Sequence, residues 1–341
     1  VLLGLSMPAD TARLAGVHGL LMTLGFLGTM ISLERAVALD RTWGYLAPLA
    51  TGLGGIALVA GAPIAAGTAL LAVGGVVFAL MYVAFDRIER SLHTSIQALG
   101  AVAWAVSAVL LLAGRSVGDV VPWLAGFLVL TIAGERLELS RLARLTAGAR
   151  RLFIVVALVF AAGVTVTTVA PDTGTRIAGL GLIGLAAWLA RNDLARRTVR
   201  GHGVTRFVAL SLLAGYAWLA VGGATWLVFG EVTAGGAHDT MLHAIFLGFV
   251  ISMVFGHAPV ILPAVLRTPL PWHDRFYVHL VLLHVGLLVR IVGGDLLGST
   301  TAWQTGGVLN VTALLVFVAS SAAAIVASYS RRLAPRMVRT T

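Results

Sequence analysis

The sequence predicts an all-α fold: a polytopic integral membrane bundle of about eleven transmembrane helices in one domain, 1–341. Hydrophobic residues make up 59 % of the 341 positions and charged residues only 11 %, with a mean hydropathy of +0.96. Soluble domains carry about 25 % charged residues, so this composition excludes them. Apolar segments of about 20 residues, the length that crosses a bilayer, recur along the whole chain. Arginines gather in alternate connections between these segments, as in membrane proteins.

Each apolar segment is expected to form one helix. The eleven segments are 14–33, 44–64, 67–85, 92–114, 117–134, 151–170, 174–190, 204–229, 240–266, 272–296 and 304–329. The first begins soon after Val1, which leaves room for a twelfth helix upstream. The chain has no Cys, so disulfides, thiolate metal sites and covalent c-type haem are excluded. Any metal would be held by His, carboxylate, Met or backbone oxygen.

The arginines predict the orientation of the chain. All 24 basic residues are Arg, and 20 of them follow odd-numbered segments. The positive-inside rule then places the N-terminus outside and the C-terminus in the cytoplasm, in a bacterial inner membrane. We read the net charge of +10 as a topology signal with affinity for the lipid bilayer, and nucleic-acid binding is not expected. The other four arginines lie toward the opposite, outer side of the membrane. They are Arg13, Arg115, Arg176 and Arg290.

A weak internal repeat relates the first, fifth and ninth segments. In each, a Gly-Phe pair is followed by an ionisable residue nine positions after the Gly. Repeats four helices apart predict a three-fold repeat of four-helix units and place these ionisable residues at similar depth. The three stretches are Gly25 to Glu34, Gly126 to Glu135 and Gly248 to His257.

Two of these ionisable residues precede an arginine, in the pairs Glu34-Arg35 and Glu135-Arg136. The favoured interpretation is an interfacial salt bridge in each pair, and the alternative is a proton-relay or metal-ligand role for the glutamates. The later arginine clusters, which begin at Arg136, are expected on a solvated cytoplasmic face.

Histidines are the strongest candidates for a functional site. Six of the nine lie between positions 238 and 297, and imidazole can stay neutral in a membrane and ligate a metal. His18 and His243 both lie about one turn inside the outer end of an odd-numbered segment. Facing each other, they could supply both axial ligands of one haem, with Arg290 paired to a propionate. The alternative is two unrelated histidines bonded to neighbouring helices.

A second metal site is predicted at His257, His279 and His284. If the ninth and tenth segments form a hairpin that turns near Thr268 and Pro269, the three imidazoles share one depth, and they would suit copper or zinc. However, His279 and His284 are about 140° apart around a helix, so a kink would be needed to converge both on His257. A site with His257 and one of the others is geometrically easier. The alternative is that each His bonds a neighbouring carbonyl or side chain.

Three stretches resemble NnrS-like membrane proteins. His243 to Gly248, with Met253 after it, resembles their His-Ala helix, Leu287 to Gly293 is similar to the Leu-Arg-rich helix that follows there, and His18 to Phe26 is similar to their early helix. The resemblance implies a twelve-helix relative of the haem-copper oxidases that binds b-type haem, with copper as a candidate second cofactor. It also implies a role in nitric oxide stress or denitrification.

The departures from that family are specific. The early helix lacks a second nearby His, the family's Gly-His-Thr-Gly is missing, and no adjacent His-His pair occurs, so the copper site of a terminal oxidase is not expected. We therefore expect a haem- and copper-binding membrane protein of nitrogen-oxide or respiratory metabolism, with a small gas or metal as its ligand. The alternatives are a transporter or metal exporter, and a non-catalytic membrane subunit of a larger complex. The sequence leaves open whether the chain is an enzyme.

Overall fold

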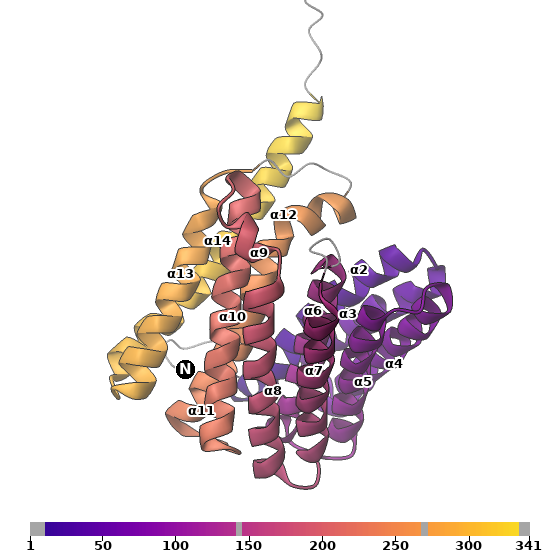
Figure 1. Ribbon diagram of the computed structural model, residues 1–341, viewed down its shortest axis with the longest axis vertical. Coiled ribbons are helices and arrows are strands. Elements are labelled where there is room, and N and C mark those ends of the chain that lie inside the picture. The colour runs from indigo at the N-terminus through magenta and orange to yellow at the C-terminus, as the bar shows by residue number, and fades with distance from the viewer. Residues whose placement is uncertain (1–10, 141–144, 267–271, 334–341) are drawn as a thin grey trace, which may run out of the picture. The chain divides into compact units, whose positions relative to one another are not determined.

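The computed structural model describes residues 11–140, 145–266 and 272–333, and every regular element within them is helical. Figure 1 shows these helices with the labels used from here on. The α-helices are α1 (Thr11–Leu20), α2 (Thr29–Leu39), α3 (Leu46–Val59), α4 (Ile64–Ile88), α5 (Leu92–Leu112), α6 (Val117–Leu139), α7 (Ala147–Val166), α8 (Pro171–Asn192), α9 (Ala195–Thr198), α10 (Gly203–Phe229), α11 (Gly235–Leu242), α12 (Ser252–Leu266), α13 (Phe276–Leu288) and α14 (Thr300–Leu333). The other helical segments are the 3₁₀ turn η2 (Thr42–Tyr45) and the π-helices η1 (Leu21–Gly28), η4 (His243–Ile251) and η5 (Val289–Leu296).

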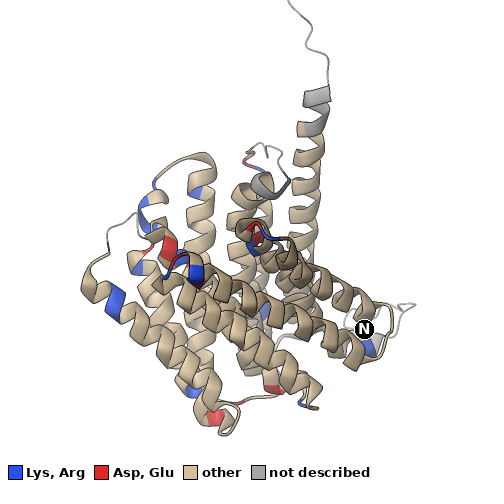
Figure 2. Cartoon of the chain, turned by 90° about the vertical axis from the view of Figure 1, so that its right-hand side faces the viewer, with Lys and Arg blue, Asp and Glu red and all other residues tan. Residues whose placement is uncertain are grey.

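The predicted fold class is confirmed. In the described part of the chain, eleven helical stretches are long and apolar enough to cross a membrane, and each overlaps one predicted segment. The fifth, predicted at 117–134, is α6, which extends to Leu139. Most charged residues lie near helix ends, with long uncharged stretches between them (Figure 2). The predicted turn near Thr268 and Pro269 lies outside the described residues.

The chain divides into two compact units. The first comprises the described residues of Val1–Leu194 and Tyr216–Phe246, and the second those of Ala195–Gly215 and Leu247–Thr341. The expectation that 1–341 acts as one transmembrane domain stays a prediction.

In the first unit, helices that follow one another in the chain pack against each other: α3 on α4, α4 on α5, α5 on α6, and α7 on α8. α6 is the most enclosed span, with 78 % of its most apolar window buried. An aromatic cluster of Phe78, Trp104 and Phe127 joins α4, α5 and α6. Gly75 makes room for the indole, because a Cβ there would lie 2.8 Å from Cδ1 of Trp104.

In the second unit, α13 and η5 pack along α14. Small residues allow this close approach: a Cβ at Gly286 would lie 2.6 Å from Nδ2 of Asn310. The same Asn310 donates a hydrogen bond to the carbonyl of Leu283 at 2.8 Å, so a buried amide joins the two helices. Such small-residue faces with an interhelical polar contact are a common way to join membrane helices.

Candidate functional site

Three π-helical segments, η1, η4 and η5, occur in the described part of the chain. π-helical turns are rare and often mark functional sites. Each of the three contains, or begins within three residues of, a residue that the sequence predicts to hold haem. His18 lies three residues before η1, His243 is the first residue of η4, and Arg290 is the second residue of η5. The backbone is therefore irregular at His243 and Arg290, whereas His18 lies in the regular helix α1, three residues before η1.

The π segments also bear on the internal repeat. The Gly-Phe pair of the first span lies in η1 and that of the ninth span in η4, whereas the pair of the fifth span, Gly126-Phe127, lies in regular α-helix α6. The first and ninth spans thus share a backbone irregularity as well as a sequence pattern. The fifth shares only the sequence pattern, and the three-fold repeat stays a prediction.

His243 is held through Nδ1. This nitrogen lies 2.9 Å from the carbonyl oxygen of Asp239, and Oδ1 of the same Asp239 is 3.4 Å away. The imidazole is half-buried. Metal-binding histidines usually have one ring nitrogen fixed in this way by a carbonyl or a carboxylate, which orients the ring and leaves the other nitrogen to ligate. The contacts of Nδ1 in His243 match this arrangement, and the role of His243 as a haem ligand stays a prediction.

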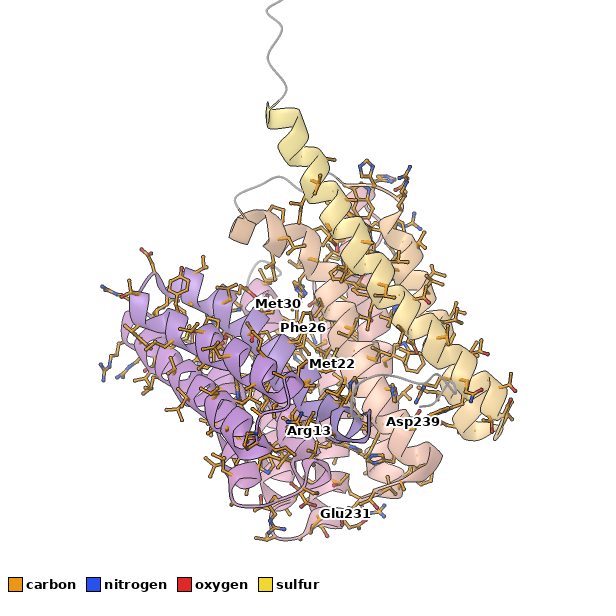
Figure 3. All side chains as sticks on the ribbon, turned by 180° about the vertical axis from the view of Figure 1, so that it is seen from behind. Arg13, Met22, Phe26, Met30, Glu231 and Asp239 are labelled. Carbon is orange, nitrogen blue, oxygen red and sulfur yellow. The ribbon has the colours of Figure 1, made fainter. Side chains whose placement is uncertain are left out.

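His18 lies on an accessible face of the first span. Its side chain is exposed, and Met22, Phe26 and Met30 follow at intervals of four residues. Figure 3 shows these three side chains following one another along that span. Phe26 is 47 % exposed, although it lies in the middle of a span. An imidazole next to apolar and thioether side chains fits the chemistry of a porphyrin, which needs an axial nitrogen and an apolar surface.

Arg290 is a buried cation in the second unit. It is 7 % exposed, and its guanidinium carbon lies 4.2 Å from the centroid of the Trp303 ring, a cation–π contact. Gly306 permits this position, because a Cβ there would lie 2.6 Å from both N and Cβ of Arg290. Burying a guanidinium inside a membrane span costs free energy, so a residue of this kind usually has a structural or functional role. Its pairing with a haem propionate stays a prediction.

The second predicted metal site belongs to the second unit. Among the described residues, no group of three or more His, Cys, Asp and Glu side chains could hold a metal ion. α13 is a regular α-helix from Phe276 to Leu288, so it has no kink that would turn His279 and His284 toward one point. The structure thus does not form the three-histidine version with His257. The two-histidine version stays a prediction.

The surroundings of these histidines differ. His279 is 1 % exposed, and neither ring nitrogen has a hydrogen-bond partner in the described part of the chain. Four phenylalanine rings surround it instead. By contrast, Nδ1 of His257 lies 2.6 Å from the carbonyl oxygen of Met253, four residues earlier, as in His243. The four rings around His279 are those of Phe207, Phe255, Phe276 and Phe317, with centroids between 4.6 and 5.8 Å away.

The two glutamates of the repeat meet at one arginine in the first unit. Nη2 of Arg35 lies 3.8 Å from Oε1 of Glu34 and 3.9 Å from Oε2 of Glu135. These distances are too long for direct hydrogen bonds and typical of contacts bridged by water. Glu34 and Glu135 therefore lie at similar depth, as the repeat predicts. The contact between Glu34 and the adjacent Arg35 matches the predicted pair, whereas Glu135 contacts Arg35 of another span.

Arg136 departs from its expected place on a solvated face. It is 6 % exposed and binds Asp193 through two hydrogen bonds, from Nε to Oδ2 at 2.7 Å and from Nη2 to Oδ1 at 3.0 Å. The hydroxyl of Tyr216 donates to Oδ2 of the same Asp193 at 2.9 Å. The expectation was wrong because the true partner is far away in the sequence, at the end of α8. Asp193 is the C-cap residue of α8, and its buried carboxylate thus joins α6 and α10.

Comparisons with known proteins identify the family of this chain. No curated protein and no solved structure matches the chain. A family described as a domain of unknown function, DUF8744, matches residues 1–326, which is nearly the whole chain. The chain therefore belongs to the DUF8744 family.

Proposed function

We propose that this chain is an integral membrane haem-binding protein in which His18 and His243 supply the axial ligands. One observation carries the proposal: π-helix η4 begins at His243 and π-helix η1 begins three residues after His18, and the sequence selects these two histidines by depth and by resemblance. The proposed setting is nitrogen-oxide or respiratory metabolism in a bacterial inner membrane. Copper is a candidate second cofactor.

The chain's own residues support the haem proposal through their positions. The carbonyl of Asp239 fixes the ring of His243, so the imidazole would need little reorganisation to bind iron. Met22 and Phe26 give the face beside His18 the apolar surface that would keep water from a porphyrin. A bound haem would supply reversible gas binding or one-electron transfer.

We expect the purified full-length protein to show a Soret absorption band that is lost or shifted when His18 or His243 is replaced by Ala. Each substitution removes one axial nitrogen and leaves the helix intact. The measurement is the absorption spectrum of the oxidised and reduced protein, together with its iron content. His202→Ala is the matched control, because His202 is exposed in the connection before α10.

The outcomes separate the three functional classes. Loss of the band in the two site variants but not in His202→Ala supports the haem proposal. An unchanged spectrum in both site variants rejects the ligand assignment. A wild-type protein with neither a Soret band nor iron favours the transporter or the non-catalytic subunit.

The proposed orientation makes a separate prediction. With 20 of the 24 arginines on one side, a reporter fused after Arg339 is expected in the cytoplasm, and one inserted near Asp172 outside. A pair of reporters with opposite compartment requirements, such as a fluorescent protein and a periplasmic phosphatase, measures both positions. Reporters on the same side, or with reversed locations, would contradict the orientation.

A further inference from the structure

The four arginines on the arginine-poor side divide into two pairs. Arg176 donates to Oδ2 of Asp172 at 2.9 Å, and Arg290 stacks on Trp303. The other two, Arg13 and Arg115, line one cavity of about 350 Å³ in the first unit. The positive-inside rule makes arginines uncommon on this side of the membrane. Two of them at a single groove therefore need a reason.

The groove lies at the ends of four spans that reach the same membrane face. Its lining comes from most of α1, the beginning of α4, the end of α5 with the connection after it, and the beginning of α6. Along α1 it extends from Arg13 to Leu20, which is about 10 Å along a helix axis. The groove thus runs from the level of lipid head groups into the hydrocarbon layer.

Below the arginines the wall is mainly apolar. The lining residues that the structure describes include no carboxylate, and their only hydroxyl groups are those of Thr68 and Ser116. The two guanidinium groups therefore carry the formal charge of the groove. The apolar wall includes Val17, Leu20, Ile64, Leu111, Leu112 and Val117.

The two arginines are placed differently. Arg13 donates hydrogen bonds to the carbonyl of Leu58, at 2.8 Å, and to that of Ala62, which fixes its guanidinium beside the end of α3. Arg115 is exposed in the connection between α5 and α6. One cation is thus rigidly placed at the groove, and the other lies in an exposed connection.

We propose that this groove binds a phospholipid with an anionic head group, whose phosphate lies at Arg13 and Arg115 and whose acyl chain lies along α1. Cations at head-group depth above an apolar wall match the two halves of such a lipid. A soluble anion would use only the arginines and would leave the wall without a partner. The proposal does not depend on haem.

Gly16 offers a way to block the groove without disturbing the protein. It lines the cavity, and a Cβ added there would meet no atom of the described residues within 4 Å. A leucine at this position would extend into the groove, while Gly→Leu in a helix favours the helical state. Gly148 in α7 is the matched control, because a Cβ there also meets nothing within 4 Å in the described part of the chain, and Gly148 does not line the groove.

The experiment compares lipid binding by the full-length protein and its variants. Native mass spectrometry measures the apparent affinity for phosphatidylglycerol and for phosphatidylcholine with identical acyl chains. We expect the wild type to prefer phosphatidylglycerol, Arg115→Gln to bind it about fivefold more weakly, and Gly16→Leu to lose the preference. Arg41→Gln, at an exposed arginine of the other side, and Gly148→Leu should bind as the wild type does.

Several outcomes would overturn the proposal. Equal affinity for the two lipids would show that the charge of the head group does not determine binding. An unaltered preference in Gly16→Leu would show that the lipid does not bind in the groove. Glycerol phosphate competing as well as the lipid would point to a soluble anion. A lower melting temperature of Gly16→Leu without added lipid would indicate that part of this chain or a second copy fills the groove.

Discussion

Replacing Asp193 with Asn is expected to lower the free energy of unfolding by about 3 to 5 kcal/mol. The substitution keeps the size of the side chain but removes the negative charge that the buried guanidinium of Arg136 binds. The two side chains are only 7 % and 1 % exposed, so water cannot replace the lost partner. The carboxylate also accepts the hydroxyl of Tyr216, which would lose a charged acceptor.

An exposed pair in the same chain supplies the control. Nε of Arg176 binds Oδ2 of Asp172 at 2.9 Å, but the two side chains are 42 % and 56 % exposed. Asp172→Asn should therefore lower the free energy of unfolding much less than Asp193→Asn does, because solvent screens and replaces the exposed interaction. Tyr216→Phe should cost about 1 kcal/mol, the usual value of one hydrogen bond. Equilibrium unfolding in mixed micelles measures all three, and similar losses for both aspartates would contradict the assignment.

The ion pair between Arg136 and Asp193 could not be predicted from the sequence. Arg136 and Asp193 are separated by 57 positions, whereas Glu135 stands next to Arg136 and offers a local partner. Reasoning along the chain therefore favours the neighbour. The signal that could have identified the true pair was Asp193 itself, a carboxylate directly after an apolar span. The spans, by contrast, were predictable, because the composition and length of each apolar segment suffice to define it.

The candidate haem residues were predictable only in part. Depth and residue type select His18 and His243, but the π-helical segments beside them depend on backbone packing. The Gly-Phe pair alone does not produce such a segment, since Gly126-Phe127 lies in regular helix. Spacing also could not foresee the four phenylalanines around His279, because they come from α10, α12, α13 and α14.

In the first unit, α7 and α8 touch backbone to backbone. A Cβ at Gly163 would lie 2.2 Å from the backbone nitrogen of Ala178, and one at Gly181 would lie 2.5 Å from Cα of Phe160. A third contact has the same form: a Cβ at Gly174 would lie 2.3 Å from the backbone nitrogen of Thr167. Backbone atoms cannot rotate away as a flexible side chain can, so the helices themselves would have to separate.

We therefore expect Gly163→Leu to destabilise the protein by at least about 3 kcal/mol, at or above the upper end of ordinary overpacking. Much of the protein should fail to accumulate in folded form. Fluorescence-detected size exclusion measures the folded yield, and Gly163→Ala, with one methyl group, should show a smaller loss in the same direction. Gly148→Leu adds the same side chain to the same helix at an open position, so its yield should equal or exceed that of the wild type. Equal yields for Gly163→Leu and Gly148→Leu would show that α7 and α8 are not in backbone contact in the folded protein.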